Sequence, residues 1–230
     1  MNATLIIAGW WLLFGGTHML LSSAWVRPRL VDRLGERSFQ AVYSLVALAS
    51  FVPLCVYYGR HKHLGPQLWV TLEPYLLARD FNIGCMLLAF VLLVGGILQR
   101  PPSSLLAQGT PQAYGMTRIT RHPVFAAAFL FGLAHLALVG ALSDVVFFGG
   151  FVVFAWLGAR HQDQRKSRDL PGYAEFQAAT SFVPFAAIVG KKQPFPGREL
   201  RWGMILLAVI LFYVVRFYHP AIFGGVLMTL

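Results

Sequence analysis

Residues 80–99 read DFNIGCMLLAFVLLVGGILQ, an apolar run with no charged residue after Asp80. A helix of about 20 mostly apolar residues is long enough to cross the hydrocarbon core of a membrane. The sequence therefore predicts an all-α, polytopic transmembrane helix bundle of about six helices, with residues 1–230 as a single domain. Because the fourth and fifth runs nearly touch, we expect a tight hairpin at Ser143 and Asp144. The other five predicted spans are Thr4–Ser22, Ala41–Tyr58, Pro123–Leu142, Asp144–Arg160 and Arg201–Tyr218.

The composition excludes an ordinary soluble domain. The chain is 57% hydrophobic and only 12% charged, with a mean hydropathy of +0.62, whereas soluble domains carry about 25% charged residues. The formal net charge is +10, which in a soluble protein would suggest nucleic acid as a partner. Here the basic residues lie mostly between the apolar runs, so we expect membrane lipids as partners and no binding of nucleic acid.

The basic residues also predict an orientation. Of the 19 Lys and Arg residues, 15 lie in the first, third and fifth connections between the predicted spans. Loops rich in Lys and Arg stay in the cytoplasm. We therefore expect both termini to lie outside the cytoplasm.

Two histidines lie where the predicted helices meet the cytoplasmic side. His18 follows Gly15-Gly16-Thr17 in the first span, and His122 precedes Pro123, a residue favoured in the first turn of a helix. Ionisable residues at membrane depth are functional candidates by default. Two simpler interpretations stay open: His18 forms a hydrogen bond across a helix interface, and His122 is an interfacial anchor.

Depth separates the remaining histidines from this pair. His135 lies thirteen residues beyond His122, about 20 Å deeper along a helix, and His61 follows the second span on that same outer side. A pair of His18 and His122 could hold one metal, since imidazole pairs suit haem iron, whereas a pair of His18 and His135 would be strained. The simpler interpretation of His61 is a solvated loop residue. His161 is interpreted as a residue at the membrane interface.

Two runs of sequence resemble a known family. Gly115-Met116-Thr117-Arg118-Ile119-Thr120-Arg121-His122-Pro123 and Thr180-Ser181-Phe182-Val183-Pro184-Phe185-Ala186-Ala187-Ile188 are similar to motifs of the NnrU-like membrane proteins, and in particular of their 15-cis-zeta-carotene isomerase branch. The resemblance implies a cis-trans isomerase that acts on the central 15-cis double bond of a poly-cis zeta-carotene, a lipophilic polyene. It also implies a haem b cofactor that an electron donor, as yet unknown, reduces, whereupon one axial histidine is released.

The resemblance also assigns residues. The haem ligands fall on His18 and His122, and His61 and His135 fall on the family's other characteristic histidines. Arg118 and Arg121 flank His122 and either pair with haem propionates, which suit the forked guanidinium group, or anchor the cytoplasmic side. The chain has no long region before its first apolar run, so we expect a retained first helix and a bacterial inner membrane.

Two other functions stay open. Arg121-His122-Pro123 also occurs in membrane methyltransferases of the isoprenylcysteine or phospholipid type, which use S-adenosylmethionine. A non-catalytic accessory protein of the NnrU type, related to haem or nitric oxide, would use the same histidines. Asp163 and Glu175 are expected to pair with Arg165, Lys166 and Arg168 in a solvated loop rather than to take part in catalysis.

Overall fold

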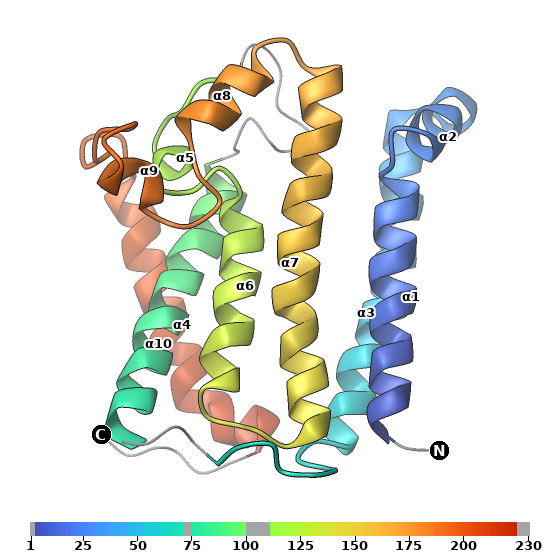
Figure 1. Ribbon diagram of the computed structural model, residues 1–230, viewed down its shortest axis with the longest axis vertical. Helices are drawn as coiled ribbons and strands as arrows, with labels where there is room; N and C mark the ends of the chain where they lie inside the picture. The colour runs from blue at the N-terminus through green and yellow to red at the C-terminus, as the bar shows by residue number, and fades with distance from the viewer. Residues whose placement is uncertain (1–2, 71–74, 100–110, 225–230) are drawn as a thin grey trace.

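The computed structural model describes residues 3–70, 75–99 and 111–224, and this part of the chain is helical with no strand. Six long helices run side by side, and four short ones gather at one end (Figure 1). The helices are α1 (Ala3–Leu21), α2 (Val26–Leu34), α3 (Glu36–Arg60), α4 (Tyr75–Leu98), α5 (Met116–Ile119), α6 (Pro123–Leu136), α7 (Leu142–Asp169), α8 (Tyr173–Ala179), α9 (Ala186–Val189) and α10 (Trp202–Phe223). The predicted all-α bundle is confirmed.

The structure shortens the fourth predicted span. Among the described residues, five helices (α1, α3, α4, α7 and α10) are long and apolar enough to cross a membrane, whereas α6 is a shorter apolar helix. The prediction that this span continues to Leu142 was wrong, because α6 ends at Leu136. The helix stops there because the chain that follows pairs with the segment after α3. The Leu68 amide donates to the Gly140 carbonyl at 2.8 Å, and the Trp69 indole donates to the Leu136 carbonyl at 2.9 Å.

The predicted hairpin at Ser143 and Asp144 was also wrong. Both residues are buried in the first turn of α7, and the turn itself lies before them. Their side chains accept hydrogen bonds from the loop after α3: the Leu64 amide donates to Ser143, and the His63 amide donates to Asp144 at 2.9 Å. These side chains therefore anchor a loop rather than form one.

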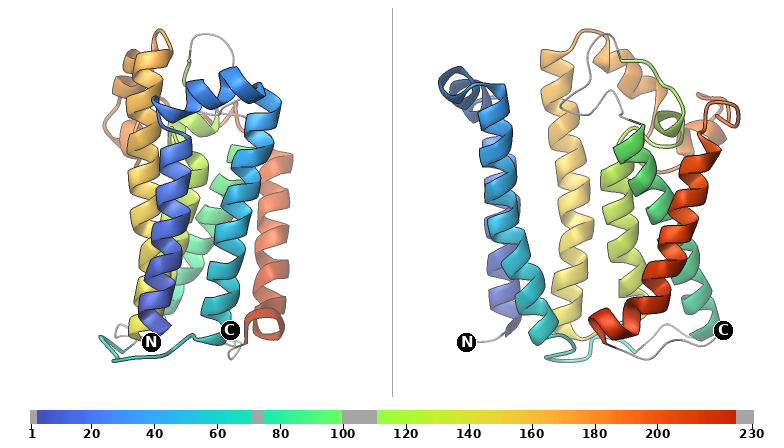
Figure 2. Two further views of the ribbon diagram at one scale, coloured as in Figure 1. Left: turned by 90° about the vertical axis from the view of Figure 1, so that its right-hand side faces the viewer. Right: turned by 180° about the vertical axis from the view of Figure 1, so that it is seen from behind.

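The long helices form two groups around α7 (Figures 1 and 2). Helix α1 packs on α3 and α7, while α6 packs on α7 and α4, and α10 packs on α4. The α1–α3–α7 group has an aromatic core that includes Trp11, Phe14 and Phe147, whereas the core around α4, α6 and α10 is aliphatic and rich in methionine and alanine. Helix α7 is therefore the shared wall between the two groups.

The two ends of the bundle differ in character. Helices α2, α5, α8 and α9 lie at one end, which we call the basic end because it holds the Lys- and Arg-rich connections. The start of α1 and the end of α10 both lie at the other end (Figure 1). Because the first and the last long helix of the described chain begin and end at the same end of the bundle, the number of long helices is even. The predicted orientation in the membrane stays a prediction.

The contact between α1 and α7 depends on a glycine. A Cβ atom at Gly150 would overlap the ring of Trp11, whereas a Cβ atom at the neighbouring Gly149 would meet nothing within 4 Å. The Trp11 indole also donates to the Phe147 carbonyl at 3.1 Å, which fixes the ring in place. Only a residue without a side chain lets α7 approach α1 this closely.

We predict that Gly150→Ala lowers the free energy of unfolding by about 1–3 kcal/mol, since overpacking of a filled core has this cost. Gly149→Ala is the matched control. It is expected to be neutral or slightly stabilising, because alanine favours a helix over glycine. Unfolding in detergent micelles checks both variants, and equal effects of the two would contradict the described packing.

Candidate functional site

The candidate site begins where the chain enters α6. Thr120 is extended and His122 lies just before Pro123, the first residue of α6. A residue before proline is kept out of the helical region, so Arg121 and His122 sit on a sharp corner. The Arg121 amide donates to the Ser181 carbonyl at 2.9 Å, and the Thr120 hydroxyl donates to the Phe182 carbonyl at 2.7 Å. The two runs of sequence that carried the family resemblance therefore lie against each other.

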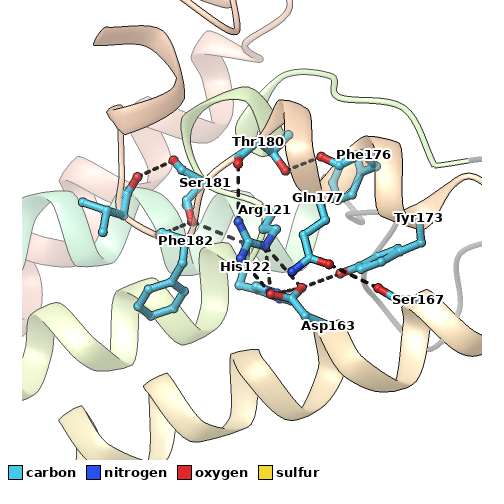
Figure 3. A network of polar contacts seen from close by, with 12 residues as sticks. Arg121, His122, Asp163, Ser167, Tyr173, Phe176, Gln177, Thr180, Ser181 and Phe182 are labelled. Carbon is cyan, nitrogen blue, oxygen red and sulfur yellow. Dashed lines mark hydrogen bonds and ion pairs between the residues drawn. The ribbon is translucent and has the colours of Figure 1, made fainter. Parts of the chain in front are cut away.

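Asp163 is the centre of this site (Figure 3). Its side chain is only 6% exposed and accepts hydrogen bonds from three others. Nε2 of His122 lies 2.7 Å from Oδ1, Nη2 of Arg121 lies 2.7 Å from Oδ2, and the Tyr173 hydroxyl donates at 2.9 Å. An ionised carboxylate can only accept, so Nε2 of His122 carries a hydrogen. Burial and the charge of Asp163 raise the pKa of the Tyr173 phenol, which therefore stays protonated and donates.

The expectation that Asp163 pairs with neighbouring basic residues in a solvated loop was wrong. Helix α7 continues to Asp169, and Asp163, Arg165 and Lys166 are all buried on it. The expected partner Arg165 lies two positions along the helix, about 200° around its axis, so it faces away from Asp163. Glu175 is exposed, as expected of a solvated residue.

Arg118 belongs to a second, separate contact. Its Nε donates to both carboxylate oxygens of Glu199, at 2.8 and 3.1 Å, and its Nη1 donates to Gln193. The hydrogen bonds from Arg118 lower the pKa of the Glu199 carboxyl. Glu199 also accepts from the Gly115 amide at 2.7 Å, so this ion pair ties the segment before α6 to the segment before α10.

His18 and His122 lie on different parts of the bundle, and the rings of Phe125 and Phe154, each in contact with the next, lie between them. Figure 1 shows α7 between α1, which carries His18, and α6, which begins after His122. The His18 ring packs against Tyr43 and Phe154, with centroid distances of 4.7 and 5.2 Å. Within the described part of the chain, no contact joins His18 to His122, and Nδ1 of His18 is buried without a hydrogen-bond partner.

The two remaining candidate histidines lie at the end opposite the basic end. Nδ1 of His135 lies 2.8 Å from the Phe131 carbonyl, and the ring stacks on Phe148 at 4.4 Å. His61 stacks on Tyr57, with 4.1 Å between ring centroids, and lies beyond the end of α3. Neither histidine is brought near His18 or His122 by the described contacts.

The sequence did not predict a contact between a histidine and a buried carboxylate at this same end. Nδ1 of His63 lies 2.8 Å from Oδ2 of Asp144, a carboxylate that is 1% exposed and that also accepts from the Tyr58 hydroxyl at 2.9 Å. The position of Asp144 at the start of an apolar run was the only signal in the sequence. A buried carboxylate needs such partners, but the sequence does not say which residues supply them.

Comparisons with known proteins agree with this architecture. The fold defines an all-α bundle in which several helices are long and apolar enough to cross a membrane. The family model described as "NnrU protein" matches residues 5–226, so the chain belongs to the NnrU family, as its motifs predicted.

Two curated relatives carry the same name. The chain is 29% identical over 171 residues to "15-cis-zeta-carotene isomerase, chloroplastic" of Zea mays, covering 71% of this chain and 45% of the relative. It is 26% identical over 196 residues to the protein of that name from Arabidopsis thaliana, covering 80% of this chain and 50% of the relative. The chain therefore spans about half the length of these relatives. No solved structure matches it.

We predict that Asp163→Asn lowers the free energy of unfolding by about 3–5 kcal/mol, because it leaves the largely buried Arg121 without its counter-charge. The control is Asp169→Asn, which removes an exposed acid from the end of the same helix and should change stability little. Thermal or SDS-induced unfolding in dodecyl maltoside measures both. If the two variants were equally stable, Asp163 would not have the structural role described.

Proposed function

We propose that this protein is a membrane cis-trans isomerase that acts on the central 15-cis double bond of a poly-cis zeta-carotene or a closely related polyene. The observation that carries the proposal is the similarity to two plant proteins that are both named for this activity. Membership of the NnrU family over nearly the whole chain supports it.

The chemistry suits a helix bundle of this kind. A C40 polyene is an apolar molecule that the bilayer supplies, and its isomerisation neither hydrolyses a bond nor transfers net electrons. The protein must therefore hold the polyene, exclude water and lower the barrier to rotation. Apolar contacts provide such holding through many small dispersion terms.

The aromatic core of the α1–α3–α7 group offers these contacts. Trp11 and Phe151 lie 5.0 Å apart, and Phe14 and Phe154 lie 4.8 Å apart, measured between ring centroids. The column continues to His18, which lies 5.2 Å from Phe154. A polyene that enters beside this column would meet aromatic faces along its length, with His18 at the basic end.

The haem b that the family resemblance implies stays a prediction, and its expected ligand pair does not fit the described contacts. Nε2 of His122 is directed at Asp163, and the rings of Phe125 and Phe154 lie between His122 and His18. Arg121 and Arg118, the expected propionate partners, form ion pairs with Asp163 and Glu199. We therefore assign no catalytic step to a haem at this position. The network around Asp163 instead holds the ends of α6, α7 and α8 together.

No described observation favours the methyltransferase alternative. The site beside Arg121-His122-Pro123 offers one acid, Asp163, and its carboxylate already accepts from three protein side chains. It is therefore poorly suited to bind the cationic amino acid portion of S-adenosylmethionine. An accessory protein would not convert the polyene, whereas an isomerase would. One experiment therefore distinguishes these two functions.

We predict that expression of this chain in a bacterial host that accumulates 15-cis poly-cis zeta-carotene in darkness lowers the ratio of the 15-cis to the 15-trans isomer. Darkness prevents isomerisation by light, and chromatography of the extracted pigments measures the ratio. An unchanged ratio, with the protein present in the membrane fraction, would contradict the proposal and favour the accessory role.

Four variants test the proposed site histidines in the same host: His18→Ala, His122→Ala, His135→Ala and His61→Ala. Each is expected to abolish the conversion. His219→Ala, at an exposed position in the last turns of α10, is the control and should retain it. Membrane-fraction immunoblots separate loss of activity from loss of the protein.

A further inference from the structure

The face of α7 opposite Asp163 presents a second polar cluster. His161 and Arg165 are four residues apart, so they lie on the same face of the helix. This face is directed toward α1 and α3, where His18 and Tyr43 lie, and Phe125 of α6 also reaches it. Together these side chains line a small cavity of about 30 Å³ at the basic end of the bundle.

The cluster contains buried nitrogen atoms without hydrogen-bond partners among the described residues. Arg165 is only 5% exposed, and neither a hydrogen bond nor an ion pair to it occurs among the described residues. Its Nε, Nδ1 of His18 and Nε2 of His161 are all buried without a hydrogen-bond partner in the described part of the chain. Arginine is almost never fully buried unless it is paired, and a buried polar group without a partner is costly.

The surroundings add positive charge rather than neutralise it. Arg27 and the buried Lys166 lie near enough to Arg165 to repel it. Three acidic groups oppose this repulsion, but Glu36 is engaged with Arg27 at 2.7 Å, Asp169 is exposed, and Tyr43 is a weakly acidic phenol. A buried guanidinium in this environment lacks an anion.

We propose that His18, His161 and Arg165 form a binding site for a phosphate oxyanion, supplied by the headgroup of an anionic membrane lipid. A cavity of about 30 Å³ holds one or two water-sized groups, which is room for the two non-bridging oxygens of a phosphodiester. The site lies at the basic end, where the excess of Lys and Arg predicts the cytoplasmic headgroup region. Basic pockets between membrane helices on that side bind anionic headgroups.

The same observations argue against a metal ion or a macrocycle in this cavity. A guanidinium beside two imidazoles repels a cation, and no group of three or more metal-ligating side chains occurs among the described residues. A macrocycle would need a pocket of about 300 Å³ or more. The shared preference of the three donors is an oxyanion, which arginine binds through its forked hydrogen bonds.

Thermal unfolding of the full chain, purified in dodecyl maltoside, tests the proposal with three additions: phosphatidylglycerol, phosphatidylcholine or inorganic phosphate. A ligand that binds only the folded state raises the unfolding temperature. We expect phosphatidylglycerol to raise the Tm and phosphatidylcholine to leave it unchanged. A rise with inorganic phosphate alone that Arg165→Gln abolishes would support the oxyanion site and identify free phosphate as its source.

Arg165→Gln separates ligand binding from a structural role. Removing an uncompensated buried charge should leave the lipid-free Tm unchanged or raise it, while the apparent affinity for phosphatidylglycerol falls about tenfold or more. His161→Ala should weaken the lipid effect in the same direction. Lys191→Gln removes an exposed charge from the same end of the bundle and should keep the full effect.

Two results would overturn the proposal. One is a phosphatidylglycerol effect of equal size in the unmodified chain, Arg165→Gln and His161→Ala, which would show general attraction to a basic protein. The other is a haem Soret band that His18→Ala and His161→Ala both abolish while the lipid effect persists, which would make these histidines metal ligands instead.

Discussion

A single buried carboxylate organises the basic end of this protein. Asp163 accepts from Arg121, His122 and Tyr173, which come from the start of α6 and from α8. Removing an ionised carboxylate from water costs several kcal/mol, and only well-placed partners offset that cost. Because these partners must stay in place to offset the cost, the ends of α6, α7 and α8 keep one geometry. The main-chain hydrogen bond from Arg121 to Ser181 extends that geometry to the segment before α9.

Helix α7 gives the basic end two faces of different kinds. On the side of α6, Asp163 accepts hydrogen bonds from three side chains. On the side of α1, Arg165 and His161 have buried nitrogen atoms without hydrogen-bond partners among the described residues. The face around Asp163 is that of a structural brace, while the face around Arg165 is where we propose that a ligand binds.

The sequence predicted the helical bundle well because hydrophobic length is a strong signal, but it placed two features wrongly. The end of α6 depends on backbone pairing between residues 64–69 and 136–143, which hydropathy does not report. The last turns of α7 are polar and were interpreted as a solvated loop, although no Gly or Pro occurs between Gly158 and Pro171. Had the helix been extended to that proline, its period would have placed Asp163 and Arg165 on opposite faces. The partners of each face come from distant parts of the chain and could not be predicted.

The central claim is that His122 is the hydrogen-bonded partner of Asp163 and lies apart from the cluster of His18 and His161. Solid-state NMR of the protein with ¹⁵N-labelled histidine tests this claim most directly. We expect His122 to give a protonated, hydrogen-bonded Nε2 signal that Asp163→Asn shifts, and the signals of His18 and His161 to respond to phosphatidylglycerol instead. A His122 signal that is insensitive to Asp163→Asn, or that is broadened by bound iron, would contradict it.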